Sequence, residues 1–369
     1  MALLLSFRVA VQLGVVVFLC GLIYFGVIAL LYVAQPLYAA QYDYTSKHVV
    51  ITGGSSGIGL ETAKIYIRLG ANVTIVGRNQ SRLDEALMVL RTLCGPNQSV
   101  ITVSVDCGSS LEEVSDALAP ALSNLGFADV IVNCAGTSVA GEFDALNPEE
   151  FERMLRTNVL GSIYPTRAVL AGMKSRKRGR IVFVSSQVAH VAIYGYSAYA
   201  ASKWALRGLA EALQMEVKPY NIYVSVVYPP DTATPGYELE MQSKPDITKK
   251  LSDSGTLFQP ERVAADLEKY STRGYFGIST GLDGWLLKQL HPGMSPLNNV
   301  WEVTEGILFA SWARLISIFY LVDWDRTCYD YVWSGNKETL QISPNINETM
   351  LNKPLNAPVD IRYSESSHA

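Results

Sequence analysis

Residues 48–59, HVVITGGSSGIG, join a run of apolar, mostly β-branched residues directly to a glycine-rich turn, and a helical pattern begins at Ile58. Glycines at 53, 57 and 59 permit a tight turn and a close approach of the backbone to a phosphate group. The N-terminus of the helix that follows favours an anion. Because the turn lies between a strand and a helix, this stretch predicts a dinucleotide-binding βα unit.

The alternation of strand and helix patterns continues from residue 47 to about residue 228. Strands are predicted at 48–52, 73–76, 100–105, 130–133, 180–185 and 222–228. Helices are predicted at 58–69, 81–93, 111–125, 148–174 and 199–217. Continuous apolar strands between helices are typical of a parallel sheet that is covered on both faces. We therefore expect an α/β fold with a doubly wound parallel sheet, the Rossmann fold, and ligands at the carboxyl ends of the strands.

The composition excludes several classes of protein. The chain has 369 residues, of which 49% are apolar and 17% charged, so it is too apolar to be disordered. Its 30 basic and 34 acidic side chains give a net charge of -4, which predicts no nucleic-acid partner. The five cysteines lack a CxxC spacing and the four histidines lack an HExxH spacing, so we expect neither a disulfide framework nor a metal site.

The N-terminal segment has the composition of a membrane helix. Residues 9–42 carry no charge, and 9–33 exceed the roughly 20 apolar residues that a spanning helix needs. A cleaved signal peptide is the alternative, although its apolar region is usually only about 7 to 15 residues long. We expect an uncleaved anchor over residues 1–42. Arg8 before the span and Lys47 after it point the N-terminus toward the cytosol.

The remainder of the chain divides into three parts. The predicted dinucleotide-binding domain covers 43–300 and includes a polar, proline-containing stretch at about 229–259, which is either a mobile lid or an ordinary surface loop. Residues 301–333 form a hydrophobic, membrane-associated segment. Its apolar core at 307–322 is short for a membrane-spanning helix. A re-entrant helix, an interfacial helix and a plain core helix therefore all remain alternatives. Residues 334–369 are a polar tail.

The end of the second strand favours NADPH as the cofactor. Arg78 offers a planar charged fork to a 2′-phosphate, and Arg82 lies where it can assist. An acidic residue here would instead bind the free ribose hydroxyl of NADH. The alternative is that Arg78 is a solvated surface charge. Asp106, after the third strand, is expected to meet the adenine, and the sequence NCAG at 133–136 lets the backbone approach the adenosine half.

Tyr199 and Lys203 open a predicted helix, and their spacing of four places the phenol and the ammonium on one face. A carbonyl that accepts hydride develops negative charge on its oxygen and needs a proton donor. A nearby ammonium is expected to lower the pKa of a phenol from about 10. We therefore predict Tyr199 as the acid and Lys203 as its pKa modifier and ribose ligand, with Ser186 orienting the carbonyl. Asn158 is expected to hold a water that relays protons.

These motifs together resemble the short-chain dehydrogenase/reductase family over residues 47–228. In that family, the residues that match Asn158, Ser186, Tyr199 and Lys203 form the catalytic tetrad. The turn, the strand ends and this resemblance together imply that the cofactor is contacted by Gly53, Ser55, Ser56, Gly57, Ile58, Gly59, Arg78, Arg82, Asp106, Asn133, Ala135, Gly136, Tyr199, Lys203, Pro229 and Thr232.

A narrower resemblance extends over most of the chain. Segments 182–187, 207–221, 228–232, 281–284 and 293–296 resemble the membrane-bound branch of the family that uses NADPH to reduce 3-ketodihydrosphingosine to dihydrosphingosine. This branch implies a long-chain sphingoid ketone as substrate, contact with membrane lipid, and an endoplasmic reticulum location with the domain facing the cytosol. That sidedness disagrees with the flanking charges.

Two other functions share the same residues. A membrane-anchored reductase of steroids or retinoids would differ only in the pocket built by the lid and the segment after it. A catalytically inactive dinucleotide-binding scaffold has no reason to keep the whole proton-transfer set. The sequence leaves open whether the chain forms a homo-oligomer.

Overall fold

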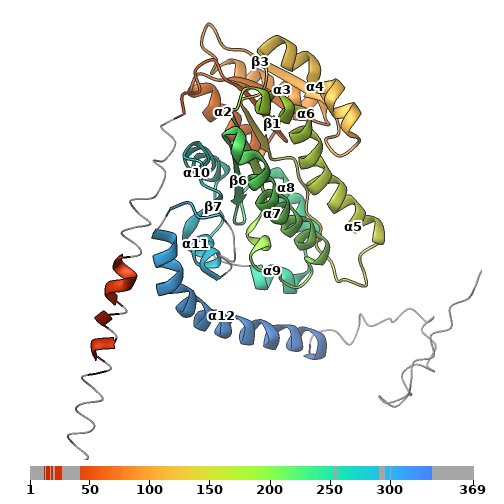
Figure 1. Ribbon diagram of the computed structural model, residues 1–369. Coiled ribbons are helices and arrows are strands. Elements are labelled where there is room, and N and C mark those ends of the chain that lie inside the picture. Colours follow the sequence, from red (N-terminus) through yellow and green to blue (C-terminus); the bar gives the residue numbers. More distant parts are fainter. Residues whose placement is uncertain are drawn as a thin grey trace, which may run out of the picture. The chain divides into compact units, whose positions relative to one another are not determined.

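The computed structural model describes residues 12, 14–16, 18, 19, 21–26, 42–252, 256–290, 296–299 and 301–334, and its centre is a parallel sheet (Figure 1). The sheet has seven strands in the order β3-β2-β1-β4-β5-β6-β7. The strands are β1 (His48–Thr52), β2 (Asn72–Gly77), β3 (Val100–Ser104), β4 (Val130–Asn133), β5 (Gly179–Val184), β6 (Ile222–Tyr228) and β7 (Gly277–Ser279). The order reverses between β1 and β4, which opens a ligand crevice at their carboxyl ends. The predicted doubly wound sheet is confirmed.

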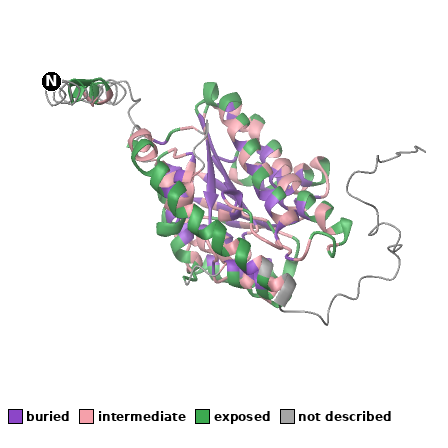
Figure 2. Ribbon diagram, turned by 90° about the horizontal axis from the view of Figure 1, so that it is seen from below, coloured by how far each residue is buried: buried purple, intermediate pink, exposed green. Residues whose placement is uncertain are grey.

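Helices cover both faces of the sheet because alternate strand residues point to opposite sides. Val49 and Ile51 belong to one buried cluster, whereas Val50 between them belongs to the other. The first cluster includes α2 (Gly57–Arg68), α3 (Gln80–Arg91) and α10 (Pro260–Thr272). The second includes α4 (Leu111–Leu125), α6 (Gly161–Ser175) and α7 (Ser197–Val217). Figure 2 shows the buried strands between these two layers.

The long helix predicted at 148–174 is interrupted. It consists of α5 (Pro148–Met154), a π-helical turn (Leu155–Leu160) and α6. A π-helical turn holds one more residue than an α-helical turn and shifts the side chains that it carries. Asn158 lies in this turn and is fully buried. The prediction of one uninterrupted helix was therefore wrong at the position of a predicted catalytic residue.

The stretch at about 229–259, expected to be a mobile lid or an ordinary surface loop, contains two helices. The ordinary-loop alternative was therefore wrong, and the role of a lid stays a prediction. They are α8 (Pro235–Ser243) and α9 (Asp246–Ser252). The Thr234 hydroxyl accepts a hydrogen bond from the backbone N–H of Tyr237 at 3.2 Å and so caps α8, and Pro235 occupies its first turn. A parallel bridge between Thr232 and Phe258 ties the two ends of the stretch together.

The last strand, β7, was not predicted because it is only three residues long. It lies at the edge of the sheet and pairs with β6. The Asn298 side chain binds the same segment: its Oδ1 accepts from the N–H groups of Phe276 (2.6 Å) and Gly277 (3.3 Å), and its Nδ2 donates to the carbonyl of Gly277 (3.2 Å). Helix α11 (Gly281–Leu290) follows β7.

The C-terminal apolar helix, α12 (Trp301–Ser334), is much longer than the apolar run at 307–322 that predicted it. Its segment Trp301–Cys328 has 28 residues and a mean hydropathy of 1.4, and only 6% of its apolar window is buried. The plain core-helix alternative was therefore wrong, and the length is sufficient to span a bilayer.

The other predicted membrane and tail segments fall mostly outside the described residues. Within the anchor expected at 1–42, the described residues between 12 and 26 are helical. The apolar side chains of Phe18, Ile23 and Phe25 are exposed there. The polar tail expected at 334–369 lies outside the described residues except for Ser334.

Replacement of Phe183 in β5 tests the core. Its ring is fully buried in the centre of the sheet, so we expect Phe183→Ala to lower the free energy of unfolding by about 3–5 kcal/mol through lost burial and a cavity. Urea denaturation followed by circular dichroism measures this change. Met215→Ala on the exposed face of α7 is the control, with an expected effect within about 0.5 kcal/mol of zero. Equal effects of the two substitutions would contradict the assignment of the core.

Candidate active site

The glycine-rich turn lies between β1 and α2 at the carboxyl edge of the sheet. Gly53 and Gly57 have φ angles of +64° and +52°, which residues with a side chain rarely adopt. A Cβ on Gly59 would lie 2.3 Å from the carbonyl oxygen of Gly53, and one on Gly53 would lie 2.8 Å from the backbone nitrogen of Ala135. The turn thus has room for backbone only, and with the N-terminus of α2 it forms a cradle that fits a pyrophosphate.

Ser55, Ser56 and Ile58 complete this turn. All three are half-buried. Ser56 is the N-cap residue of α2, and its side chain makes no capping hydrogen bond. Its hydroxyl is therefore available to a phosphate oxygen at the N-terminus of α2.

Arg78 and Asp106 lie at neighbouring strand ends, after β2 and β3. Arg78 Nη1 is 3.8 Å from Asp106 Oδ2, and the Arg78 side chain is 67% exposed. An ion pair this exposed is weak, so the guanidinium can turn to a phosphate at little cost. Arg82 lies in the first turn of α3 and is exposed as well; its backbone N–H donates to Asn79 Oδ1 at 3.0 Å. The structure thus places both arginines at one edge of the predicted cofactor site.

The end of β4 is fixed to β1 by a hydroxyl that the sequence analysis missed. The backbone N–H of Ala135 donates to Thr52 Oγ1 at 3.1 Å. Asn133 is buried and donates through Nδ2 to Thr166 Oγ1 at 2.9 Å. Its side chain is therefore part of the core, and the predicted contact of this residue with the adenosine half is left to its backbone. The sequence could have pointed to Thr52 by its position, because it is a hydroxyl residue that ends the strand directly before the glycine-rich turn.

Asn158 connects the loop after β4 to α7. Its Oδ1 accepts from the Thr137 N–H at 2.8 Å, and its Nδ2 donates to the Thr137 carbonyl and to Ser202 Oγ, both at 2.9 Å. A Cβ on Gly136 would lie 3.2 Å from Asn158 Oδ1 and 3.4 Å from Lys203 Nζ. The amide and the ammonium therefore face the same small space. The relay of protons between them stays a prediction.

Lys203 and Tyr199 face each other in the first two turns of α7, as their spacing predicted. Lys203 Nζ lies 5.8 Å from the centre of the Tyr199 ring and donates to the carbonyl of Val184 at 2.9 Å. Burial lowers the pKa of Lys203 to about 8. The group therefore stays mostly protonated at neutral pH.

The pKa of Tyr199 is raised above its ordinary value. Burial contributes most and Glu240 adds to the rise; a hydrogen bond with Ser186 opposes it, and Asp231 raises the pKa further. The expectation that Lys203 depresses this pKa was wrong for the surroundings that the protein itself provides, because loss of solvation outweighs any attraction by the ammonium. The raised pKa keeps the phenol protonated at neutral pH, which is the state that a proton donor needs.

Ser186 completes the group of predicted catalytic residues. It follows β5, and its Oγ accepts a hydrogen bond from the Val188 N–H at 3.2 Å. The Ser186 side chain lowers the pKa of the Tyr199 phenol, so the two hydroxyl groups act on each other at the point where a substrate carbonyl would receive its proton. The structure therefore brings together four side chains that come from the π-helical turn, the end of β5 and α7.

Pro229 and Thr232 begin the chain segment that leaves the site. The Pro229 carbonyl accepts from the Gln187 N–H at 3.1 Å, and Thr232 Oγ1 donates to the Pro230 carbonyl at 2.7 Å. These bonds hold the start of the α8–α9 segment against the loop that carries Ser186. Contact of either residue with the cofactor stays a prediction.

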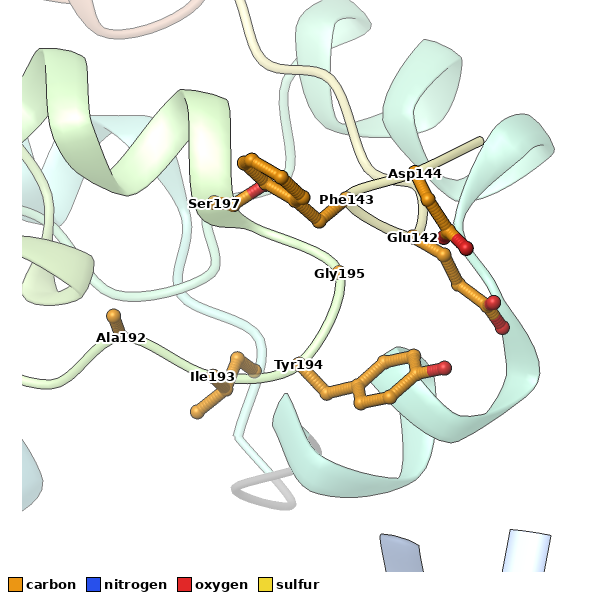
Figure 3. Close-up of a pocket in the computed structure, with 8 residues that line it drawn as sticks. All are labelled: Glu142, Phe143, Asp144, Ala192, Ile193, Tyr194, Gly195 and Ser197. Atoms are coloured by element: carbon orange, nitrogen blue, oxygen red, sulfur yellow. The ribbon is translucent and has the colours of Figure 1, made fainter. Parts of the chain in front are cut away.

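A cavity of about 470 Å³ lies at the start of α7 (Figure 3). It is lined by Glu142, Phe143, Asp144, Ala192, Ile193, Tyr194, Gly195 and Ser197. Figure 3 shows the rings of Phe143 and Tyr194 on two sides of the cavity, with the carboxylates of Glu142 and Asp144 next to each other. The N–H of Gly141 donates to the carbonyl of Gly195 at 2.9 Å and so joins the two loops that build it.

A comparison with known protein families decides the relationship. The family model described as short chain dehydrogenase matches residues 47–244. The chain belongs to the short-chain dehydrogenase family. The resemblance that the sequence predicted is confirmed, and this short-chain dehydrogenase takes a nicotinamide dinucleotide as its cofactor.

Curated relatives of this short-chain dehydrogenase are named 3-ketodihydrosphingosine reductase or 3-dehydrosphinganine reductase. The 3-ketodihydrosphingosine reductase of Bos taurus is 44% identical over 300 residues, which cover 81% of this chain and 90% of that protein. The 3-dehydrosphinganine reductase of Danio rerio has the same identity and coverage. The 3-ketodihydrosphingosine reductase of Dictyostelium discoideum is 35% identical and covers 74% of this chain and 85% of its own length.

Solved structures of related folds support the architecture. A crystal structure of levodione reductase matches with a TM-score of 0.58 at 22% identity, over 64% of this chain and 96% of that chain. A short chain dehydrogenase/reductase family protein matches with a TM-score of 0.54 at 28% identity, over 64% of this chain and 97% of its own. The first similarity is one of fold alone.

Two acidic residues near Tyr199 were not predicted from the sequence. Asp231 lies in the segment 228–232 that carried the narrower resemblance, but it received no role. Glu240 lies in α8, within a stretch interpreted as a loop, so nothing in the sequence pattern pointed to it. Glu240 reaches the surroundings of Tyr199 from α8, and Asp231 from the segment between β6 and α8.

Replacement of Gly59 tests the dinucleotide cradle. We expect Gly59→Ala to weaken dinucleotide binding by about 10-fold or more, because the new Cβ would collide with the Gly53 carbonyl and open the turn. Fluorescence titration with the cofactor measures the change. Gly208→Ala in α7, where a Cβ meets nothing within 4 Å, is the control and should bind normally. Unchanged binding in Gly59→Ala would place the cofactor elsewhere.

Proposed function

We propose that this short-chain dehydrogenase is a 3-ketodihydrosphingosine reductase, which reduces the ketone of a long-chain sphingoid base with NADPH to give dihydrosphingosine. The observation that carries the proposal is the extent of the similarity to relatives of that name. It covers 81% of the chain and 90% of the Bos taurus protein, and so it continues past the residues 47–244 shared with the wider family.

The side chains around Tyr199 support a proton transfer to the reacting oxygen. The bound cofactor supplies the hydride. As the carbonyl carbon accepts it, negative charge grows on the oxygen, and Tyr199 donates its phenolic proton there. Ser186 orients the carbonyl by a hydrogen bond. Lys203, with a pKa of about 8, stabilises the phenolate that remains at neutral pH.

Reprotonation of the phenol uses the residues behind it. Asn158 and Lys203 both reach the space next to Gly136, which suits a water between the amide and the ammonium. Asn158 also binds Ser202 Oγ, so the amide is held at a fixed distance from α7. This arrangement supports the roles of a relay for Asn158 and of a ribose ligand for Lys203.

Selection of NADPH over NADH is assigned to Arg78. The residue follows β2, where the ribose of the adenosine half binds in this fold. Its guanidinium is exposed and only weakly held by Asp106. A 2′-phosphate carries more negative charge than the Asp106 carboxylate, so the guanidinium turns toward that phosphate when it is present.

Attachment to a membrane suits a substrate with a long alkyl chain. The exposed apolar helix α12 supports it, because 28 of its residues form a segment long enough to cross a bilayer. The sequence of residues 9–33 supports a second anchor. We assign the protein to the endoplasmic reticulum membrane with its catalytic domain toward the cytosol, in line with the narrower resemblance.

Removal of the Tyr199 hydroxyl tests the reaction. We expect Tyr199→Phe to reduce turnover of 3-ketodihydrosphingosine by about 10²-fold to 10⁴-fold, with NADPH binding retained. NADPH oxidation followed by its absorbance measures turnover. Tyr220→Phe, which removes a hydroxyl from an exposed tyrosine, is the matched control and should keep full activity. Normal turnover in Tyr199→Phe would refute its role as the acid.

Removal of the Arg78 side chain tests the cofactor preference. We expect Arg78→Ala to raise KM for NADPH by about 10-fold to 100-fold while KM for NADH changes little, because only NADPH carries the phosphate that the guanidinium binds. Arg91→Ala removes an exposed arginine from the end of α3 and serves as the control. Equal changes of KM for NADPH and NADH would mean that Arg78 does not bind the 2′-phosphate.

A further inference from the structure

Two carboxylates lie beside the catalytic tyrosine on the side of α8. Tyr196 and Tyr199 stand next to each other, with ring centres 5.5 Å apart. The Tyr196 hydroxyl donates a hydrogen bond to Oε1 of Glu240. The Glu240 carboxylate therefore contacts the tyrosine whose ring lies beside Tyr199. Asp231 belongs to the same group, since both carboxylates act on Tyr199.

A buried lysine holds these carboxylates together. Lys244, at the end of α8, is only 3% exposed. Its Nζ lies 3.4 Å from Glu240 Oε1 and 3.8 Å from Asp231 Oδ2, and 5.3 Å from the centre of the Tyr196 ring. Within the described part of the chain, this Nζ has no hydrogen-bond partner. The ammonium thus balances charge between the two acids without using its own donors.

The group offers a carboxylate oxygen to a further partner. Among the described residues, the carboxylates of Asp231 and Glu240 lie beside the one ammonium of Lys244. Among the described residues, Tyr196 and Lys244 both contact Oε1 of Glu240, which leaves Oε2 for another partner. The Glu240 side chain is only 11% exposed, and a carboxylate in such surroundings is costly unless it is paired. The cluster therefore favours the arrival of a cation at a point next to Tyr199.

The proposed substrate carries such a cation in the required place. A 3-ketodihydrosphingosine bears an ammonium group on the carbon next to its ketone. When Tyr199 and Ser186 hold the ketone oxygen, the ammonium lies within the immediate surroundings of the reacting carbon. Among the described residues, Glu240 and Asp231 are the carboxylates whose charges act on Tyr199, whereas Glu142 and Asp144 line the cavity at the start of α7.

We infer that Glu240 and Asp231 bind the ammonium of the amino-ketone substrate, and that Lys244 and Tyr196 position the two carboxylates for this contact. The inference rests on the proposed function and adds the groups that select an α-amino ketone over an uncharged ketone. It also assigns a role to α8, because this helix supplies a carboxylate that selects the substrate.

The test compares two ketones of equal chain length. One is 3-ketodihydrosphingosine, and the other has hydrogen in place of the amine. We expect the ratio of their kcat/KM values to fall in Glu240→Gln and in Asp231→Asn by about 10-fold to 100-fold, mainly through KM, because a charge-assisted hydrogen bond to the ammonium is lost. Glu238→Gln makes the same change on the exposed side of α8 and should keep the wild-type ratio.

Different results would overturn the inference and the proposed function. An equal loss of activity toward both ketones in Glu240→Gln and Asp231→Asn would overturn the inference, because it would mean that the carboxylates only hold the α8 segment in place. If one variant does not fold, as judged by thermal unfolding and NADPH binding, the ratio measured in the other decides. Failure of the wild-type protein to reduce either ketone would overturn the proposed function together with the inference, whereas equal use of both ketones by the wild type would overturn the inference alone.

Discussion

The hydrogen bond between the Lys203 ammonium and the Val184 carbonyl is the contact on which the geometry of the site depends. An ammonium removed from water must find its acceptors within the protein, and here it finds the last residue of β5 at 2.9 Å. This bond fixes the first turns of α7 against the sheet and so fixes Tyr199 one turn earlier. It also explains why residue 136 is a glycine, since a Cβ there would approach the ammonium and the Asn158 amide.

Much of the fold follows from the sequence because the central strands are apolar on both faces. Six strands and the glycine turn are marked by β-branched runs that end in glycine or polar residues. β7 escaped prediction because three residues show no periodicity, and it depends on Asn298, which is distant in sequence. The π-helical turn was also beyond prediction, since the surrounding pattern is helical throughout and the turn is stabilised by the contacts of Asn158 with Thr137 and Ser202.

The identities of the candidate catalytic residues could be predicted, but their electrostatics could not. The spacing of Tyr199 and Lys203 fixes their proximity in any helix. The shift of the Tyr199 pKa instead depends on burial and on Glu240 and Asp231. Glu240 lies in a helix that the sequence pattern did not indicate, and Asp231 lies in the segment before that helix. A local motif therefore specifies which groups react, whereas the tertiary fold sets the protonation states in which they meet the substrate.

The contact of Asn298 with β7 has a consequence for the behaviour of many copies on one surface. An exposed edge strand offers N–H and C=O groups to which a strand of another molecule can add, and proteins generally cover such edges. Proposed attachment to a membrane would confine copies of this chain to two dimensions and increase their encounters. By occupying both polar groups of Gly277, the Asn298 amide acts as a short substitute for an eighth strand and guards the sheet against self-association through its edge.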